Sequence, residues 1–182
     1  MRNISTKISD SGMSDHSGVA VVWNSAITPA PNVSPVTSGV PSIRLAQLRS
    51  LITDRHGRPT PPIARLLGAR VLAVDDGRVS IEFAVKDEFL TPGGGVQGGI
   101  ISAYVDLCMA LAAHTLFEPG QRLSTSSLTV SFLAPVTAGP VLGEGRVIKR
   151  GRSGVCREAV LHDREGRECA QASSVGSIRA RT

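Results

Sequence analysis

The chain has 182 residues, of which 41% are hydrophobic, 19% are charged and only 3% are aromatic, so we expect a core of aliphatic side chains. Its formal charge of +5 suits an anionic ligand, such as nucleic acid, a phosphorylated small molecule or an acidic membrane surface. No apolar run approaches the ~20 residues that span a bilayer, and the first residues lack the apolar core of a secretory signal, so we expect a cytoplasmic protein.

The first 40 residues are rich in Ser, Pro and Gly and show no periodicity, which predicts a disordered extension. Residues 41–68 are expected to form an N-terminal helical segment. Apolar residues recur at helical spacing over 42–54, and Pro61 and Pro62 precede a second short helix that ends before Gly68. Residues 69–182 are expected to form the folded domain.

The apolar period changes to two after Ala69, on both sides of the turn Asp75-Asp76-Gly77, and this pattern predicts a β-hairpin. Residues 98–115 predict one helix of roughly 16–18 residues, apolar on nearly every side and therefore buried all round. Four more strands are predicted over 123–133, 141–149, 153–163 and 167–178. Because their connections are short, we expect a meander. The fold class is α+β, with an antiparallel sheet of about six strands wrapped around one long helix.

Asp106 is the only residue between Gly98 and Ala113 that carries charge at neutral pH. A carboxylate on an apolar helix is costly to bury. It is either held by a neighbouring strand, exposed at a subunit interface, or placed in a cavity for chemistry. We favour a functional role, because buried carboxylates concentrate at functional sites.

Two glycines, Gly98 and Gly99, follow Gln97 at the start of this helix, where unpaired backbone N–H groups and the helix dipole favour a developing oxyanion. The alternative is a turn that needs glycine. Residues 93–98 also match a dinucleotide-binding pattern, but one helix followed only by strands does not make a Rossmann unit.

A basic loop follows much later in the chain, with Arg157 nearby. It is either a solvated hairpin tip or a site for a phosphate-bearing ligand. Its residues are Lys149, Arg150, Gly151, Arg152 and Ser153, and Arg146 is a further cation nearby. The three cysteines and four histidines are widely spaced and predict neither a disulfide framework nor a metal site, and we expect no cofactor.

Taken together, the strings VQGGIISAYVD (96–106), LTVSFLAP (128–135), Arg150-Gly151-Arg152 and DREGR (163–167) resemble the PaaI-like, phenylacetate-pathway group of hotdog-fold acyl-CoA thioesterases. The resemblance covers about residues 60–180. It implies a hotdog fold and hydrolysis of an acyl-CoA thioester to free acid and CoA, with CoA as part of the substrate. Gln97 stands where the family usually has a histidine.

The resemblance also implies roles. Asp106 would be the general base or the nucleophile, and the Gly98 N–H, with Gln97 beside it, would polarise the thioester carbonyl. The remaining positions would contact substrate or CoA: Thr91, where many members have an asparagine, Gly99, the hydroxyl positions Ser124 and Thr125, and Lys149, Arg150, Gly151 and Arg152 along the CoA phosphates. Members form homodimers, often paired into tetramers, and the acid faces the Gln-Gly-Gly segment of a partner subunit.

Three other functions compete with this one. A non-catalytic acyl-CoA sensor or carrier would use the same cavity. An enoyl-CoA hydratase needs an Asp/His pair near the helix start, but no histidine lies between residues 57 and 113. Nucleic-acid binding is disfavoured by the low aromatic content and the lack of a recognition-helix pattern. We therefore expect partners other than nucleic acid or membrane.

Overall fold

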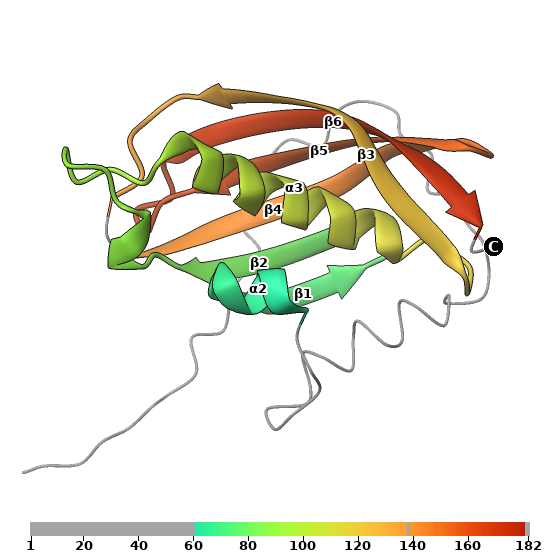
Figure 1. The fold of residues 1–182 in the computed structure, drawn as a ribbon, viewed down its shortest axis with the longest axis horizontal. Helices are drawn as coiled ribbons and strands as arrows, with labels where there is room; N and C mark the ends of the chain where they lie inside the picture. Colours follow the sequence, from blue (N-terminus) through green and yellow to red (C-terminus); the bar gives the residue numbers. More distant parts are fainter. Residues whose placement is uncertain (1–60, 138, 181–182) are drawn as a thin grey trace, which may run out of the picture. The chain divides into compact units, whose positions relative to one another are not determined.

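The computed structural model describes residues 61–137 and 139–180, and the expectations for residues 1–60 lie outside the described residues. Two helices, a 3-10 turn and six strands follow one another (Figure 1). They are α2 (Pro62–Leu66), β1 (Ala69–Asp75), β2 (Arg78–Ala84), η1 (Asp87–Phe89), α3 (Gly98–His114), β3 (Gln121–Phe132), β4 (Pro140–Arg150), β5 (Gly154–His162) and β6 (Glu168–Ala180). The short helix after Pro61, the β1–β2 hairpin and the long helix from Gly98 are confirmed.

The strands form a single antiparallel sheet in the order β1-β2-β4-β5-β6-β3, and α3 lies across one of its faces (Figure 1). The α+β architecture expected from the sequence is therefore confirmed. The helix packs mainly against β4, β2 and β5. No helix in the described part of the chain has the length and apolar content of a membrane span.

The predicted four-strand meander is wrong in one respect. Strands β4, β5 and β6 are neighbours in turn, but β3 pairs with β6 at the far edge of the sheet instead of with β4. The connection 133–139 can reach roughly 23 Å when extended, whereas β3 and β4 lie three strand spacings, about 14 Å, apart. A short connection therefore did not require neighbouring strands.

Two glycines of β4 bring α3 close to the sheet. A Cβ atom at Gly145 would lie 2.4 Å from the Cys108 carbonyl oxygen, and one at Gly143 would lie 2.6 Å from the Cys108 sulfur. Around this contact lie buried side chains of the helix and the sheet, including Phe83 of β2 stacked on Tyr104 of α3. The helix backbone is thus fixed directly against the middle of the sheet.

The expectation that α3 is buried all round is also wrong for the described chain. Ala103, Asp106 and Ala110, which recur at helical spacing, are only half-buried, and Gly99 on the same stripe is exposed. One curved sheet covers the opposite side of the helix and leaves this stripe partly open. Asp106 is the charged group on it.

Candidate active site

Asp106 is held at one of its two carboxylate oxygens. The hydroxyl of Thr125, on β3, donates a hydrogen bond of 3.1 Å to Oδ1 of Asp106. Within residues 61–137 and 139–180, Asp106 forms no ion pair and its Oδ2 has no hydrogen-bond partner. The carboxylate is therefore oriented by β3 and open at its second oxygen.

Of the two hydroxyl positions that the sequence suggested, only Thr125 reaches Asp106. Thr125 pairs with the buried Gly176 of β6, on the face that carries α3. Ser124 pairs with Ser177, and neighbouring residues of a strand point to opposite faces. The side chain of Ser124 therefore lies on the outer face of the sheet.

Behind Thr125 lies a buried arginine, Arg157, which the sequence suggested only as a neighbour of the basic loop. Nη2 of Arg157, on β5, donates to Thr125 Oγ1 at 3.3 Å and also to the hydroxyl of Ser174 on β6. Arg157 is only 1% exposed. Burial lowers the pKa of this guanidinium, and the charge of Asp106 partly opposes that effect. Every second residue of β5 points inward: Val155, Arg157, Ala159 and Leu161. This alternation could have indicated from the sequence that Arg157 is buried.

At the start of α3 the side chain of Gln97 caps its own helix. Its Oε1 accepts hydrogen bonds from the N–H groups of Gly99, at 2.6 Å, and Ile100, at 3.3 Å. The Gly99 N–H is therefore occupied. The Gly98 N–H donates to none of the described residues. It lies at the N-terminus of α3, the positive end of the helix dipole. The Gln97 side-chain NH₂ group keeps both of its donors.

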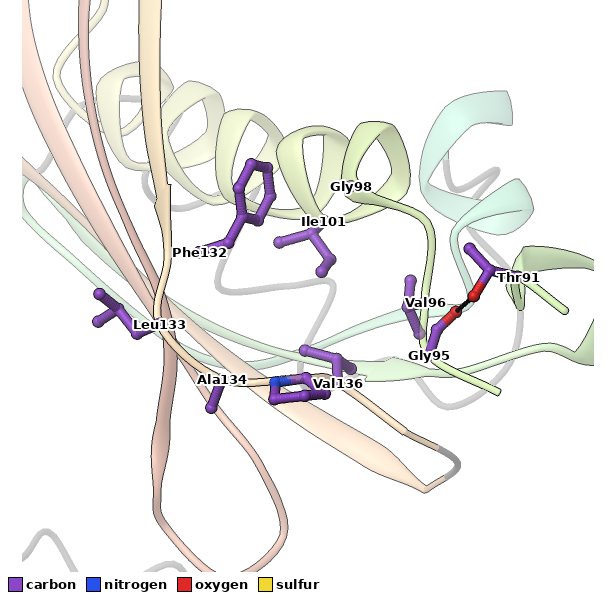
Figure 2. A pocket seen from close by; sticks show the side chains of 10 residues that line it. Thr91, Gly95, Val96, Gly98, Ile101, Phe132, Leu133, Ala134 and Val136 are labelled. Carbon is purple, nitrogen blue, oxygen red and sulfur yellow. Dashed lines mark hydrogen bonds between the residues drawn. The ribbon is translucent and has the colours of Figure 1, made fainter. Parts of the chain in front are cut away.

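A cavity of about 380 Å³ opens beside Gly98 (Figure 2). Its walls are mostly apolar, and the ring of Phe132 comes so near that a Cβ at Gly98 would lie 3.3 Å from it. Thr91 lies on one wall, but its hydroxyl donates to the Gly95 carbonyl at 3.0 Å. The lining residues are Thr91, Gly95, Val96, Gly98, Ile101, Phe132, Leu133, Ala134, Pro135 and Val136.

The structure does not bring Gly98 and Asp106 together within one chain. They are eight residues apart on α3, which corresponds to about 12 Å along the helix axis. Each sits beside a different part of β3: Phe132 lies next to Gly98, and Thr125 next to Asp106. The two halves of the expected site are thus at separate positions.

The basic loop lies on the Asp106 side. Lys149 and Arg150 end β4, and Gly151 and Arg152 follow in the turn before β5; all four are exposed. Nη2 of Arg150 donates to Oε1 of Gln121 at 3.0 Å. Gln121 is the first residue of β3, roughly 13 Å of extended strand before Thr125. Lys149, Arg150, Gly151 and Arg152 are therefore grouped near the carboxylate half of the site and not near the cavity.

Comparisons with known proteins agree on one family. The family model of the thioesterase superfamily matches residues 93–170. A candidate esterase of Saccharolobus solfataricus is 33% identical over 110 residues, 60% of this chain and 78% of the relative. The proofreading thioesterase EntH of Klebsiella pneumoniae is 29% identical over 103 residues, 57% of this chain and 75% of EntH.

Solved structures extend the match to the fold. A candidate thioesterase of Ralstonia eutropha, related to phenylacetic acid degradation, is 34% identical with a TM-score of 0.63, over 66% of this chain and 92% of the other. The PaaI protein of the Escherichia coli phenylacetic acid degradation operon, at 20% identity and a TM-score of 0.59, shares the fold over 63% of this chain and 86% of its own. This chain therefore belongs to the hotdog-fold thioesterase superfamily.

Proposed function

We propose that this chain hydrolyses an acyl-CoA thioester to the free acid and CoA, without a cofactor. Membership of the thioesterase superfamily supports thioester hydrolysis in general. The observation that carries the proposal is the Asp106 carboxylate, held at Oδ1 by Thr125 and open at Oδ2, on the half-buried stripe of an otherwise apolar helix. A charge in that place suits a reacting group better than a packing role.

The chemistry needs few groups, because a thioester is already activated. As a general base, Asp106 takes a proton from water while the water oxygen attacks the carbonyl carbon. As a nucleophile, it attacks that carbon itself and the resulting anhydride is hydrolysed. In both routes the C–S bond breaks and the CoA sulfur leaves as a thiolate that takes up a proton. The Gly98 N–H stabilises the oxyanion, a contribution of about 3–4 kcal/mol in comparable sites.

The proposed site is shared between two copies of the chain. The thioester carbonyl must lie ~3 Å from the Gly98 N–H and within reach of Asp106, directly or through one water, and one chain holds these two groups about 12 Å apart. Strand β3 is an edge of the sheet, with Thr125 and Phe132 marking the two half-sites. Antiparallel pairing of two β3 edges about a two-fold axis between these residues brings Asp106 of one copy opposite Gly98 of the other. In this arrangement the second copy also covers the open stripe of α3.

The substrate then spans both copies. The apolar cavity beside Gly98 suits the acyl group, since its walls offer aliphatic and aromatic contacts. The exposed cations of the β4–β5 turn suit the CoA phosphates and lie on the copy that supplies Asp106. Gln97, next to Gly98, offers its two side-chain N–H donors to the carbonyl or the pantetheine amides.

Thiol release from a panel of short-chain, long-chain and aromatic acyl-CoA esters tests the proposal. We expect the unsubstituted protein to hydrolyse at least one of them and Asp106→Asn to lose roughly 10²–10⁴-fold in kcat. Asp87→Asn, an exposed acid on η1, is the matched control and keeps full activity. Binding of the esters without turnover by the unsubstituted protein would instead identify a sensor or carrier.

A further inference from the structure

We infer that Arg157 is a positioning residue, which fixes the orientation of Asp106 through the hydroxyl of Thr125. The inference deepens the proposed function and rests on it. Arg157 does not line the cavity and forms neither a hydrogen bond nor an ion pair with Asp106, so among the described residues its hydrogen-bonded connection to the carboxylate runs through Thr125. The attraction between the two charges acts in addition to this connection. Two hydrogen bonds follow one another, from Arg157 on β5 to Thr125 on β3, and from Thr125 to Asp106.

The direction of these hydrogen bonds follows from the groups involved. A guanidinium has only donors, so Nη2 of Arg157 must donate to Thr125 Oγ1 at 3.3 Å. The hydroxyl's single proton is then directed to Oδ1 of Asp106, at 3.1 Å. Donation from a cation polarises the hydroxyl and strengthens its hydrogen bond to the carboxylate. The Thr125 side chain is thereby held in the rotamer that contacts Asp106.

An aliphatic side chain would cost less free energy to bury at this position than Arg157 does. It is 1% exposed, and its inward neighbours on β5 are Val155 and Ala159. Its Nε and Nη1 atoms are buried and have no hydrogen-bond partner among the described residues. No carboxylate in the described part of the chain forms an ion pair with it. Burying a charge without an ion-pair partner costs free energy, so an apolar side chain of similar size at this position should not lower stability.

The sheet makes room for the guanidinium. A Cβ atom at Gly176, the residue opposite Thr125 on β6, would lie 3.2 Å from Nη2 of Arg157. On the same strand Ser174 accepts a second hydrogen bond from Nη2. All the side-chain hydrogen bonds that Arg157 forms with the described residues thus come from one nitrogen, the one that contacts Thr125. Of the two hydroxyls that this nitrogen contacts, that of Thr125 is the one that reaches Asp106.

Kinetics and urea unfolding of Arg157→Met separate positioning from a structural role. We expect kcat to fall about 10- to 100-fold, KM to stay within about twofold and the unfolding midpoint to stay equal or rise. In the double variant with Thr125→Val, kcat should equal that of Thr125→Val alone, because both changes break one relay. Arg70→Met is the matched control: it removes an exposed arginine, paired with Glu82 on β2, and leaves kcat unchanged.

The other outcomes separate the two hypotheses. If the unsubstituted protein is active, three results overturn the inference alone. They are an unchanged kcat in Arg157→Met, losses that multiply in the double variant, and a lowered unfolding midpoint in Arg157→Met. A parent without turnover on the whole acyl-CoA panel overturns the proposed function and the inference with it. If Arg157→Met does not fold, Ser174→Ala removes the second acceptor of Nη2. A kcat that is then lower at an unchanged KM supports positioning, and an unchanged kcat overturns it.

Discussion

The hydroxyl oxygen of Thr125 lies 3.1 Å from Oδ1 of Asp106, so an edge strand orients the carboxylate of the central helix. Thr125→Val keeps the shape of the side chain and removes the donor. We expect kcat to fall at least about 10-fold, the scale of a hydrogen bond to a charged group. Thr125→Ser should retain most of the activity because its hydroxyl remains.

The control for this change is Ser173→Ala. Ser173 is exposed on β6, one strand in from the β3 edge, and pairs with Thr129 on one side and Glu158 on the other. It therefore tests the loss of a hydroxyl on the outer face of the sheet, away from α3, and kcat should not change. Equal kcat values for Thr125→Val and the unsubstituted protein would show that the carboxylate needs no support from β3.

The role assigned to the Gly98 N–H is testable because Gly98 is the first residue of α3. Proline is well tolerated at that position, and Gln97 before it already has an extended backbone. Gly98→Pro removes the N–H and should reduce kcat roughly 10²–10³-fold. Gly98→Ala is the matched control, because it adds the same contact with Phe132 and keeps the N–H. Similar losses in both variants would point to crowding by the ring.

A shared site predicts complementation between two inactive variants. Asp106→Ala chains keep Gly98, and Gly98→Pro chains keep Asp106. If subunits are mixed, about half of the dimers contain both kinds of chain, and one of their two sites is intact. We expect thiol release to recover to about a quarter of the unsubstituted level. Mixtures that stay inactive after verified subunit exchange would place both groups in a site within one chain.

Strand and helix positions were predictable because they depend on local patterns. The turn at Gly77 has a positive φ of 68°, which suits the glycine that marked the hairpin in the sequence. The place of β3 was not predictable from local patterns. It depends on which strand edge is free after the sheet curls around α3, and a connection of several residues permits more than one partner.

The candidate site likewise contains one residue that local sequence patterns predict and one that they do not. Asp106 was visible because one charge interrupts an apolar helix, and this signal needs no knowledge of the fold. Arg157 was grouped with the basic loop by its sequence distance. Its inward orientation depends on strand alternation, and its contact with Thr125 depends on the order of β5, β6 and β3. Such contacts between distant segments appear only once the sheet order is known.

The close contact between β4 and α3 predicts a large effect of one methyl group. In Gly145→Ala the new Cβ would lie 2.4 Å from the Cys108 carbonyl oxygen, a backbone atom that no rotamer change can move away. We expect a loss of about 1–3 kcal/mol or more in the free energy of unfolding, measured in urea. Gly154→Ala on β5 is the control, since its Cβ meets nothing closer than 3.7 Å. Equal midpoints for the two variants would contradict this packing.

The β5–β6 turn predicts a pH dependence of stability. Partial burial alone would raise the pKa of Asp163, but hydrogen bonds from the backbone and guanidinium of Arg167, its charge, and the Glu165 N–H hold that pKa below its usual value. Because the folded-state pKa is depressed, the carboxylate stabilises the fold above its unfolded pKa of ~3.9. This contribution is lost as the pH falls through the folded-state value.

Asp163→Asn should therefore lower the urea midpoint at pH 7. The difference from the unsubstituted protein should shrink as the pH falls below about 4, where the carboxyl of the unfolded chain is protonated first and that of the folded chain at lower pH. Glu165→Gln changes an exposed acid in the same turn and controls for net charge. Hydrogen exchange of the Arg167 N–H reports the same loss locally, because that N–H donates to Oδ1 of Asp163 at 2.8 Å. A difference between Asp163→Asn and the unsubstituted protein that is constant from pH 7 to pH 3 would show that the turn does not depend on the ionised carboxylate.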